Sequence, residues 1–147
     1  FAPGGSLDEV IAYFDSSALL DIVLGGPKSP ASFLDFEAFV SSELLAVECV
    51  RTIDRLRAQG TLSAGEAVAR REVTMDWLEA VDLVLLERSI LSRASEPLPL
   101  PLGTLDAIPL ATALVWRDRT RHELVMATHD RQLALAARSF GIEIFGG

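Results

Sequence analysis

Three aspartates in this chain stand where an α/β fold places its ligand-binding groups. Asp15 directly follows the apolar run of residues 10–14, and Asp130 comes two residues after the run 123–128. Asp106 directly precedes a segment with helical character. In an open parallel sheet, ligands bind in the crevice outside the carboxyl ends of the strands. We therefore expect the three carboxylates to share one crevice.

Glu48 is a fourth candidate, because it lies about one and a half turns into a predicted helix that follows the second strand. Clustered carboxylates raise one another's pKa unless a cation compensates them. Mg²⁺ and Mn²⁺ prefer carboxylate and water oxygens, and such an ion can activate water and stabilise a phosphoryl group in transfer. Taken singly, the aspartates are also adequate helix caps, and Glu48 could be a surface acid paired with Arg51 or Thr52.

Other chemistries find little support in the sequence. His122 and His129 are the only histidines, and no Gly-x-Ser-x-Gly nucleophile motif accompanies them. Lys28 is the only lysine and stands in no phosphate-binding Gly-x-x-x-x-Gly-Lys loop. Cys49 is the single cysteine, which excludes an internal disulfide and a cysteine-rich zinc site.

The pattern of apolar residues and caps predicts alternating strands and helices, and hence a mainly parallel sheet. Ser16 and Ser17 are expected to cap the first helix, and Ser63–Glu66 forms a capping box. Asp106 is expected to be an N-cap, with Pro109 at the third helical position. The predicted strands are 10–14, 38–41, 81–86, 123–128 and 142–145, and the predicted helices are 18–24, 43–59, 63–80, 87–94, 107–117 and 131–140.

Length and composition fit one globular domain. We expect residues 1–7 to be a linker or tag remnant and residues 8–147 a single domain of the 147-residue chain. The net charge of −8 argues against binding of nucleic acid through bulk electrostatics, but 12 of the 13 basic residues are arginines, which recognise phosphate well. No apolar run approaches the roughly 18 residues of a membrane span, and the cysteine content suits the cytoplasm.

Four short motifs, in this order and spacing, resemble the PIN-domain family, and the chain length is similar to that of the stand-alone VapC-type toxins of bacterial toxin-antitoxin systems. The resemblance extends from Val10 to Phe145. The motifs are Tyr-Phe-Asp-Ser-Ser-Ala-Leu-Leu at 13–20, Ser42-x5-Glu48-x2-Arg51, Leu-Asp-Ala-Ile-Pro-Leu-Ala-Thr-Ala at 105–113, and Thr128-x-Asp130-x2-Leu133.

The resemblance implies a three-layer α/β/α, Rossmann-like fold with a central, mainly parallel sheet of about four to five strands. It also implies a Mg²⁺- or Mn²⁺-dependent endoribonuclease that cleaves single-stranded or loop RNA with a metal-activated water. A VapB-like antitoxin would neutralise the enzyme, and a homodimer is expected. The acidic quartet of the family falls on Asp15, Glu48, Asp106 and Asp130, and its supporting hydroxyls fall on Ser16 or Ser17 and on Thr128.

The resemblance leaves several details open. Arg51 is either a salt-bridge partner or a contact to RNA phosphate. Pro109 stands where many relatives have histidine, which removes a polar side chain near the site but no metal-binding acid. The predicted helical hairpin from Glu43 to Ala80 is a plausible surface for the antitoxin or a second protomer. Two alternatives are a non-catalytic PIN-like module for RNA binding or assembly, and a metal-dependent nuclease or phosphatase acting on DNA with the same site.

Overall fold

The computed structural model describes residues 10–25 and 36–145, so the predicted linker at residues 1–7 lies outside the described residues. The described strands are β1 Ile11–Phe14, β2 Ala38–Ser42, β3 Val81–Val84, β4 Leu124–Ala127 and β5 Glu143–Phe145. The described helices are α1 Ser16–Val23, α2 Leu44–Ala58, α3 Ala64–Ala80, α4 Arg88–Ala94, α5 Thr104–Thr120 and α6 Arg131–Ser139. The alternation of strands and helices predicted from the sequence is confirmed.

The strands form one parallel sheet in the order β3-β2-β1-β4-β5. After β3, the chain returns to the other side of β1 to form β4, so the order of the strands reverses between β1 and β4. At the carboxyl ends of these two strands, Phe14 lies opposite Ala127. In doubly wound sheets, the crevice at such a reversal is where ligands bind.

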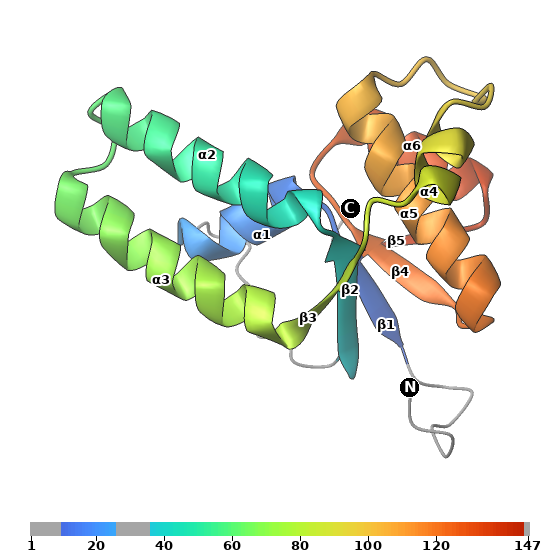
Figure 1. The fold of residues 1–147 in the computed structure, drawn as a ribbon, viewed down its shortest axis with the longest axis horizontal. Coiled ribbons are helices and arrows are strands. Elements are labelled where there is room, and N and C mark those ends of the chain that lie inside the picture. Colours follow the sequence, from blue (N-terminus) through green and yellow to red (C-terminus); the bar gives the residue numbers. More distant parts are fainter. Residues whose placement is uncertain (1–9, 26–35, 146–147) are drawn as a thin grey trace.

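Alternate residues of β1 separate two hydrophobic cores, because successive side chains of a strand point to opposite faces. Ile11 and Tyr13 pack in the core that includes residues of α5 and α6. Ala12 and Phe14 pack in the core that includes residues of α1, α2 and α3. Figure 1 shows α1–α3 on one side of the sheet and α4–α6 on the other. The predicted three-layer arrangement is therefore confirmed.

The first helix begins earlier than predicted. α1 starts at Ser16, and Asp15 occupies the N-cap position with an extended backbone, so the prediction that Ser16 and Ser17 cap this helix is wrong. The Ser17 hydroxyl is hydrogen-bonded to the Asp15 carboxylate and to the N–H of His129, a residue 112 positions away, rather than to a free N–H of the helix. The helix thus follows β1 without a connecting loop.

α5 also begins earlier, at Thr104 with Gly103 as N-cap, so the prediction of Asp106 as N-cap is wrong. Asp106 instead lies in the first turn, and Pro109 is inside the helix, where it cannot donate a hydrogen bond to the Leu105 carbonyl. All residues from 107 to 114 are buried. Packing on both sides of this segment holds the helix together despite the proline, since tertiary contacts dominate helix stability.

Helices α2 and α3 form an antiparallel hairpin that extends from the sheet as an arm (Figure 1). The capping box predicted at its turn is confirmed, because Ser63 and Glu66 exchange side-chain and backbone hydrogen bonds. At the base of the arm, Trp77 packs against Phe14 and Phe39. None of the helices among the described residues combines the length and apolar character needed to cross a membrane.

Candidate active site

Asp15 is the most firmly held of the predicted acids. Its side chain is buried, and its Oδ2 atom accepts hydrogen bonds from Ser17 Oγ at 2.7 Å and from Thr128 Oγ1 at 2.8 Å. Ser17 belongs to α1, whereas Thr128 directly follows β4. The pairing of β1 with β4 therefore brings together a carboxylate and a hydroxyl that are 113 residues apart.

The same two hydroxyls also fix the loop after β4. Ser17 Oγ accepts a hydrogen bond from the backbone N–H of His129 at 2.9 Å, and Thr128 Oγ1 accepts one from that of Asp130 at 3.0 Å. Asp130 in turn caps α6, because its Oδ1 accepts a hydrogen bond from the N–H of Leu133 at 3.0 Å. Asp130 is thus held in place by the cap of the helix that follows it.

Glu48 projects from α2 toward the end of β1. Its Oε2 lies 3.5 Å from Ser16 Oγ, which is the donor. Burial and the charge of Asp15 raise the pKa of the Glu48 carboxyl, with a smaller contribution from Asp106. Glu48 therefore faces the other acids and is not the surface acid paired with Arg51, although its backbone carbonyl accepts a hydrogen bond from Thr52.

Asp106 completes the group from the first turn of α5. Burial raises the pKa of its carboxyl, and the charges of Asp130 and Asp15, together with a side-chain hydrogen bond to Asp130, raise it further. Among the described residues, the charged groups that shift the pKa of Asp106 and Glu48 are all carboxylates. The fold thus gathers four carboxylates at the reversal point of the sheet, and within the described residues no basic side chain offsets the charge of Asp106 or Glu48.

The donor set of this site consists of hard oxygen atoms, which suit Mg²⁺ or Mn²⁺. Within residues 10–25 and 36–145, no three His, Cys, Asp or Glu side chains converge closely enough to hold one ion together. Mg²⁺ commonly binds through one or two carboxylates and keeps several waters, so it does not require a complete cage of protein ligands. The residues present therefore fit a divalent cation by chemistry and charge.

A small cavity beneath the acids involves residues that the sequence did not single out. It lies between Asp15, Glu48, Tyr13, Ser41 and Pro109, and its volume is about 10 Å³. Ser41 Oγ donates a hydrogen bond to the Phe14 carbonyl at 2.5 Å. Ser41 and Ser42 form the carboxyl end of β2, and Asp15 directly follows the carboxyl end of β1. This shared position of polar residues at the ends of two strands is the sequence signal that could have indicated the role of Ser41.

Tyr13 in this cavity has an unusual environment. Its hydroxyl is fully buried and makes no hydrogen bond within the described part of the chain. Burial raises the pKa of the phenol, the charge of Asp15 adds to this effect, and the nearby Ser41, Ser42 and Thr112 only partly offset it. Pro109, in place of the histidine of many relatives, adds an apolar wall to the same cavity.

Comparison with known proteins identifies the family. Ribonuclease VapC46 of Mycobacterium tuberculosis (strain ATCC 25618 / H37Rv) is 31% identical to this chain over 136 residues, which cover 90% of this chain and 94% of the relative. This chain belongs to the VapC family. No protein-family model matches the sequence. A solved toxin-antitoxin complex from Klebsiella pneumoniae has the same fold, with a TM-score of 0.58 and 19% identity over 84% of this chain and 90% of that chain.

In this VapC-family chain, Arg51 lies outside the acidic group. Its side chain is 70% exposed, and its Nη1 atom lies 3.4 Å from Asp54 Oδ2. Arg51 therefore forms a salt bridge, but its partner is Asp54 and not Glu48. The contact with RNA remains a prediction.

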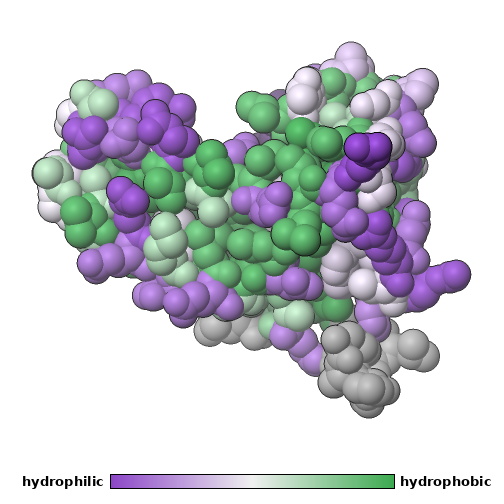
Figure 2. Space-filling view, in the orientation of Figure 1, coloured by the Kyte–Doolittle hydropathy of each residue, from purple (hydrophilic) through white to green (hydrophobic). Residues whose placement is uncertain are grey.

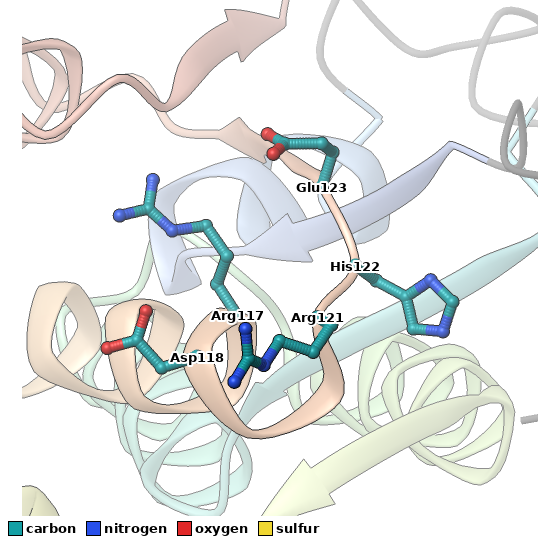
Figure 3. A pocket seen from close by; sticks show the side chains of 5 residues that line it. All are labelled: Arg117, Asp118, Arg121, His122 and Glu123. Carbon is teal, nitrogen blue, oxygen red and sulfur yellow. The ribbon is translucent and has the colours of Figure 1, made fainter.

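A larger surface pocket, of about 590 Å³, contains none of the predicted site residues. Its side chains come from the C-terminal part of α5 and the loop before β4 (Figure 3). This position is at the amino end of β4, opposite the edge that carries the acids. The lining mixes both signs of charge, and it is formed by Arg117, Asp118, Arg121, His122 and Glu123.

Proposed function

We propose that this VapC-family protein is a toxin endoribonuclease that cleaves single-stranded or loop RNA with the help of Mg²⁺ or Mn²⁺. The observation that carries the proposal is the group Asp15, Glu48, Asp106 and Asp130, which come from four different elements and meet at the reversal point of the sheet. Uncompensated carboxylates lower the stability of a fold, so their presence is best explained by a bound cation and a phosphate substrate.

Asp15, Asp106 and Asp130 would hold one or two ions, partly through bridging waters, and Glu48 would serve as a further ligand or orient the attacking water. When bound, a divalent cation lowers the pKa of a coordinated water and stabilises negative charge on the phosphoryl group.

The residues of the chain have separate tasks in this proposal. Ser17 and Thr128 donate hydrogen bonds to Oδ2 of Asp15, which fixes the carboxylate, so Oδ1 would be the oxygen that binds a cation. Ser16 holds Oε2 of Glu48, so Oε1 would receive the proton of the attacking water. Such pre-positioning lowers the cost of organising the site during the reaction.

An antitoxin partner and a homodimer are further parts of the proposal. Exposed apolar side chains on the α2–α3 hairpin support a protein partner there, because a soluble surface rarely gathers such groups without one. Figure 2 shows apolar surface on this arm and across the middle of the face in view. The exposed apolar residues of the hairpin are Val47, Val68, Val73 and Met75.

The test combines calorimetric titration of Mn²⁺ with an RNA cleavage assay. We expect wild type to bind Mn²⁺ and to cleave RNA, and the Asp15→Asn/Asp106→Asn double variant to fold but do neither. Asp54→Asn is the matched control, since it removes a helix carboxylate that is compensated by arginines. Thermal unfolding of each protein checks the fold.

Three results would contradict the proposal. A wild type that binds no Mn²⁺ would reduce the acids to caps and surface charges. RNA binding that is unaffected by EDTA and is followed by no cleavage would indicate a non-catalytic module. Cleavage of DNA but not RNA would assign the same site to another substrate.

A further inference from the structure

The distribution of charge singles out the outer end of the α2–α3 arm. The whole chain has a net charge of −8, but residues 51–72 contain five arginines and three acidic residues, which give this segment +2. The segment comprises the second half of α2, the turn and the first half of α3. Figure 1 shows it as the outer end of one arm, and in Figure 2 hydrophilic side chains gather over the α2 side of this end. An acidic protein thus has a basic end, which attracts polyanions locally.

One flank of α2 connects this basic end with the acidic site. Glu48, Arg51 and Arg55 are spaced by three and four residues, so they lie in a row along one side of the helix. Glu48 interacts with Asp15 and Asp106, whereas Arg51 and Arg55 are exposed. At about 1.5 Å of rise per residue, the two arginines are about 6 Å apart along the helix axis. The row therefore leads from the site outward along the arm.

The nearby acid Asp54 is held more closely by Arg57 than by Arg51. Asp54 Oδ1 accepts two hydrogen bonds from Arg57, from Nε at 3.1 Å and from Nη2 at 2.9 Å. Arg51 reaches only the other oxygen, at 3.4 Å, and Arg71 is also close enough to influence the Asp54 carboxyl. The Arg55 side chain makes no hydrogen bond or ion pair with another described residue, and its backbone carbonyl accepts a hydrogen bond from the N–H of Gln59. The guanidinium groups of Arg51 and Arg55 are therefore available to an external anion.

We propose that Arg51 and Arg55 bind neighbouring phosphates of single-stranded RNA and lead the strand along α2 to the acidic site. The inference rests on the proposed ribonuclease function. The planar guanidinium matches a phosphate with two parallel hydrogen bonds, and its weak hydration favours such contacts. In a chain with a strongly negative net charge, this row of cations selects the direction from which the substrate approaches.

Fluorescence anisotropy with a labelled, unstructured 12-nucleotide RNA tests this path. All proteins carry Asp15→Asn to keep the RNA intact, which a gel verifies, and Mg²⁺ is present. Each phosphate contact to a single strand contributes about 0.7 to the slope of log K against log salt. Arg51→Gln/Arg55→Gln should therefore lower the slope by about 1.4 and weaken binding about 25-fold at 0.1 M NaCl.

Arg121→Gln/Arg138→Gln is the matched control, because it removes two exposed arginines near the ends of α5 and α6 and changes the net charge equally. We expect its affinity to stay within about threefold of the parent. Equal losses in the two double variants would overturn the proposal, since the effect would then be one of net charge. Asp54→Asn should tighten binding, because it removes the carboxylate that Arg51 contacts at 3.4 Å, and unchanged or weaker binding would contradict a role of Arg51 in holding phosphate.

The outcomes separate this inference from the proposed function. If the protein without Asp15→Asn cleaves RNA but Arg51→Gln/Arg55→Gln binds as tightly as its parent, only the path along α2 is wrong. If the protein neither binds nor cleaves RNA, the ribonuclease proposal fails and the path fails with it. Circular dichroism confirms that the variants fold, which is expected because both arginines are exposed.

Discussion

Asp106 and Asp54 lie on helices on opposite faces of the same sheet, and the fold shifts their pKa values in opposite directions. Burial and neighbouring carboxylates raise the pKa of Asp106, whereas hydrogen bonds and charge from Arg57 lower that of Asp54, with smaller contributions from Arg51 and Arg71. The chain thus compensates Asp54 on the arm with arginines, whereas the described groups that act on Asp106 at the strand ends are carboxylates. This contrast indicates that the strand ends are arranged for function at some cost in stability.

The largest expected effect is on catalysis. Asp106→Asn should reduce RNA cleavage by about a thousandfold, the scale expected when a group at a reaction centre is lost. Asp54→Asn should leave the cleavage rate constant within about twofold at saturating RNA, because its carboxylate lies on the arm, away from the reaction centre. Single-turnover cleavage of one RNA by both variants measures the difference. Equal losses of cleavage activity in the two variants would show that Asp106 has no special role in the reaction.

The next effect concerns metal binding. Mn²⁺ at a hundred times its dissociation constant should raise the free energy of unfolding of wild type by about 2.7 kcal/mol, because it binds the folded state only. The same concentration should raise that of Asp54→Asn equally and that of Asp15→Asn/Asp106→Asn far less. Urea unfolding with and without Mn²⁺ provides the values. Stabilisation that survives in the double variant would place the ion elsewhere.

Tyr13 is a neutral group beneath the acids whose hydroxyl is buried at some cost in stability, like the partly buried carboxylate of Asp106. Its buried hydroxyl makes no hydrogen bond within the described chain, so Tyr13→Phe should raise the free energy of unfolding by about 1 kcal/mol, since a buried unsatisfied polar group is costly. Thr112→Val is the control, because the Thr112 hydroxyl donates to the Ile108 carbonyl at 2.7 Å and its loss should not stabilise the protein. Destabilisation by Tyr13→Phe in urea unfolding would show that the hydroxyl has a partner in solution.

The smallest effect is on the pH dependence of metal-free stability. Asp106 has a raised pKa in the folded state, so its protonation favours folding, and its contribution becomes unfavourable as pH rises from the unfolded pKa through the folded one. In EDTA, Asp106→Asn should therefore be more stable than wild type at pH 7, by less than about 1 kcal/mol for a partly exposed group. This difference should vanish below the unfolded pKa of an aspartate, about 3.9.

Asp54→Asn should show the opposite behaviour over the acidic range. The lowered pKa of Asp54 contributes stability above its unfolded pKa, and this contribution is lost as pH falls through the folded pKa. The variant should therefore be less stable than wild type at pH 7 and equal to it at low pH. Melting temperatures from pH 2.5 to 7 in EDTA compare both variants. If both variants melted above wild type at pH 7, or both melted below it, the opposite roles assigned to Asp106 and Asp54 would be wrong.

The sequence alone determined the local parts of this protein. The order of strands and helices followed from apolar periodicity, and the capping box at Ser63–Glu66 followed from side-chain spacing, because both depend on residues within one or two turns. The position of Asp15 after β1 and the role of Asp130 at the start of α6 were readable for the same reason. The short motifs then indicated the family, which the similarity to a VapC protein supports.

Only the tertiary structure decided how these parts meet. It placed β1 beside β4, so that Thr128 reaches Asp15, and it assigned Ser17 to Asp15 and Ser16 to Glu48. In the tertiary structure α5 also begins at Thr104, so that Pro109 lies within the helix. The bonds of Thr128 to Asp15 and of Ser16 to Glu48 join residues far apart in the chain, and local sequence patterns do not encode which strands and helices meet. The sequence therefore specified the acids and the elements that carry them, whereas burial of the two sheet faces determined which side chains share the site.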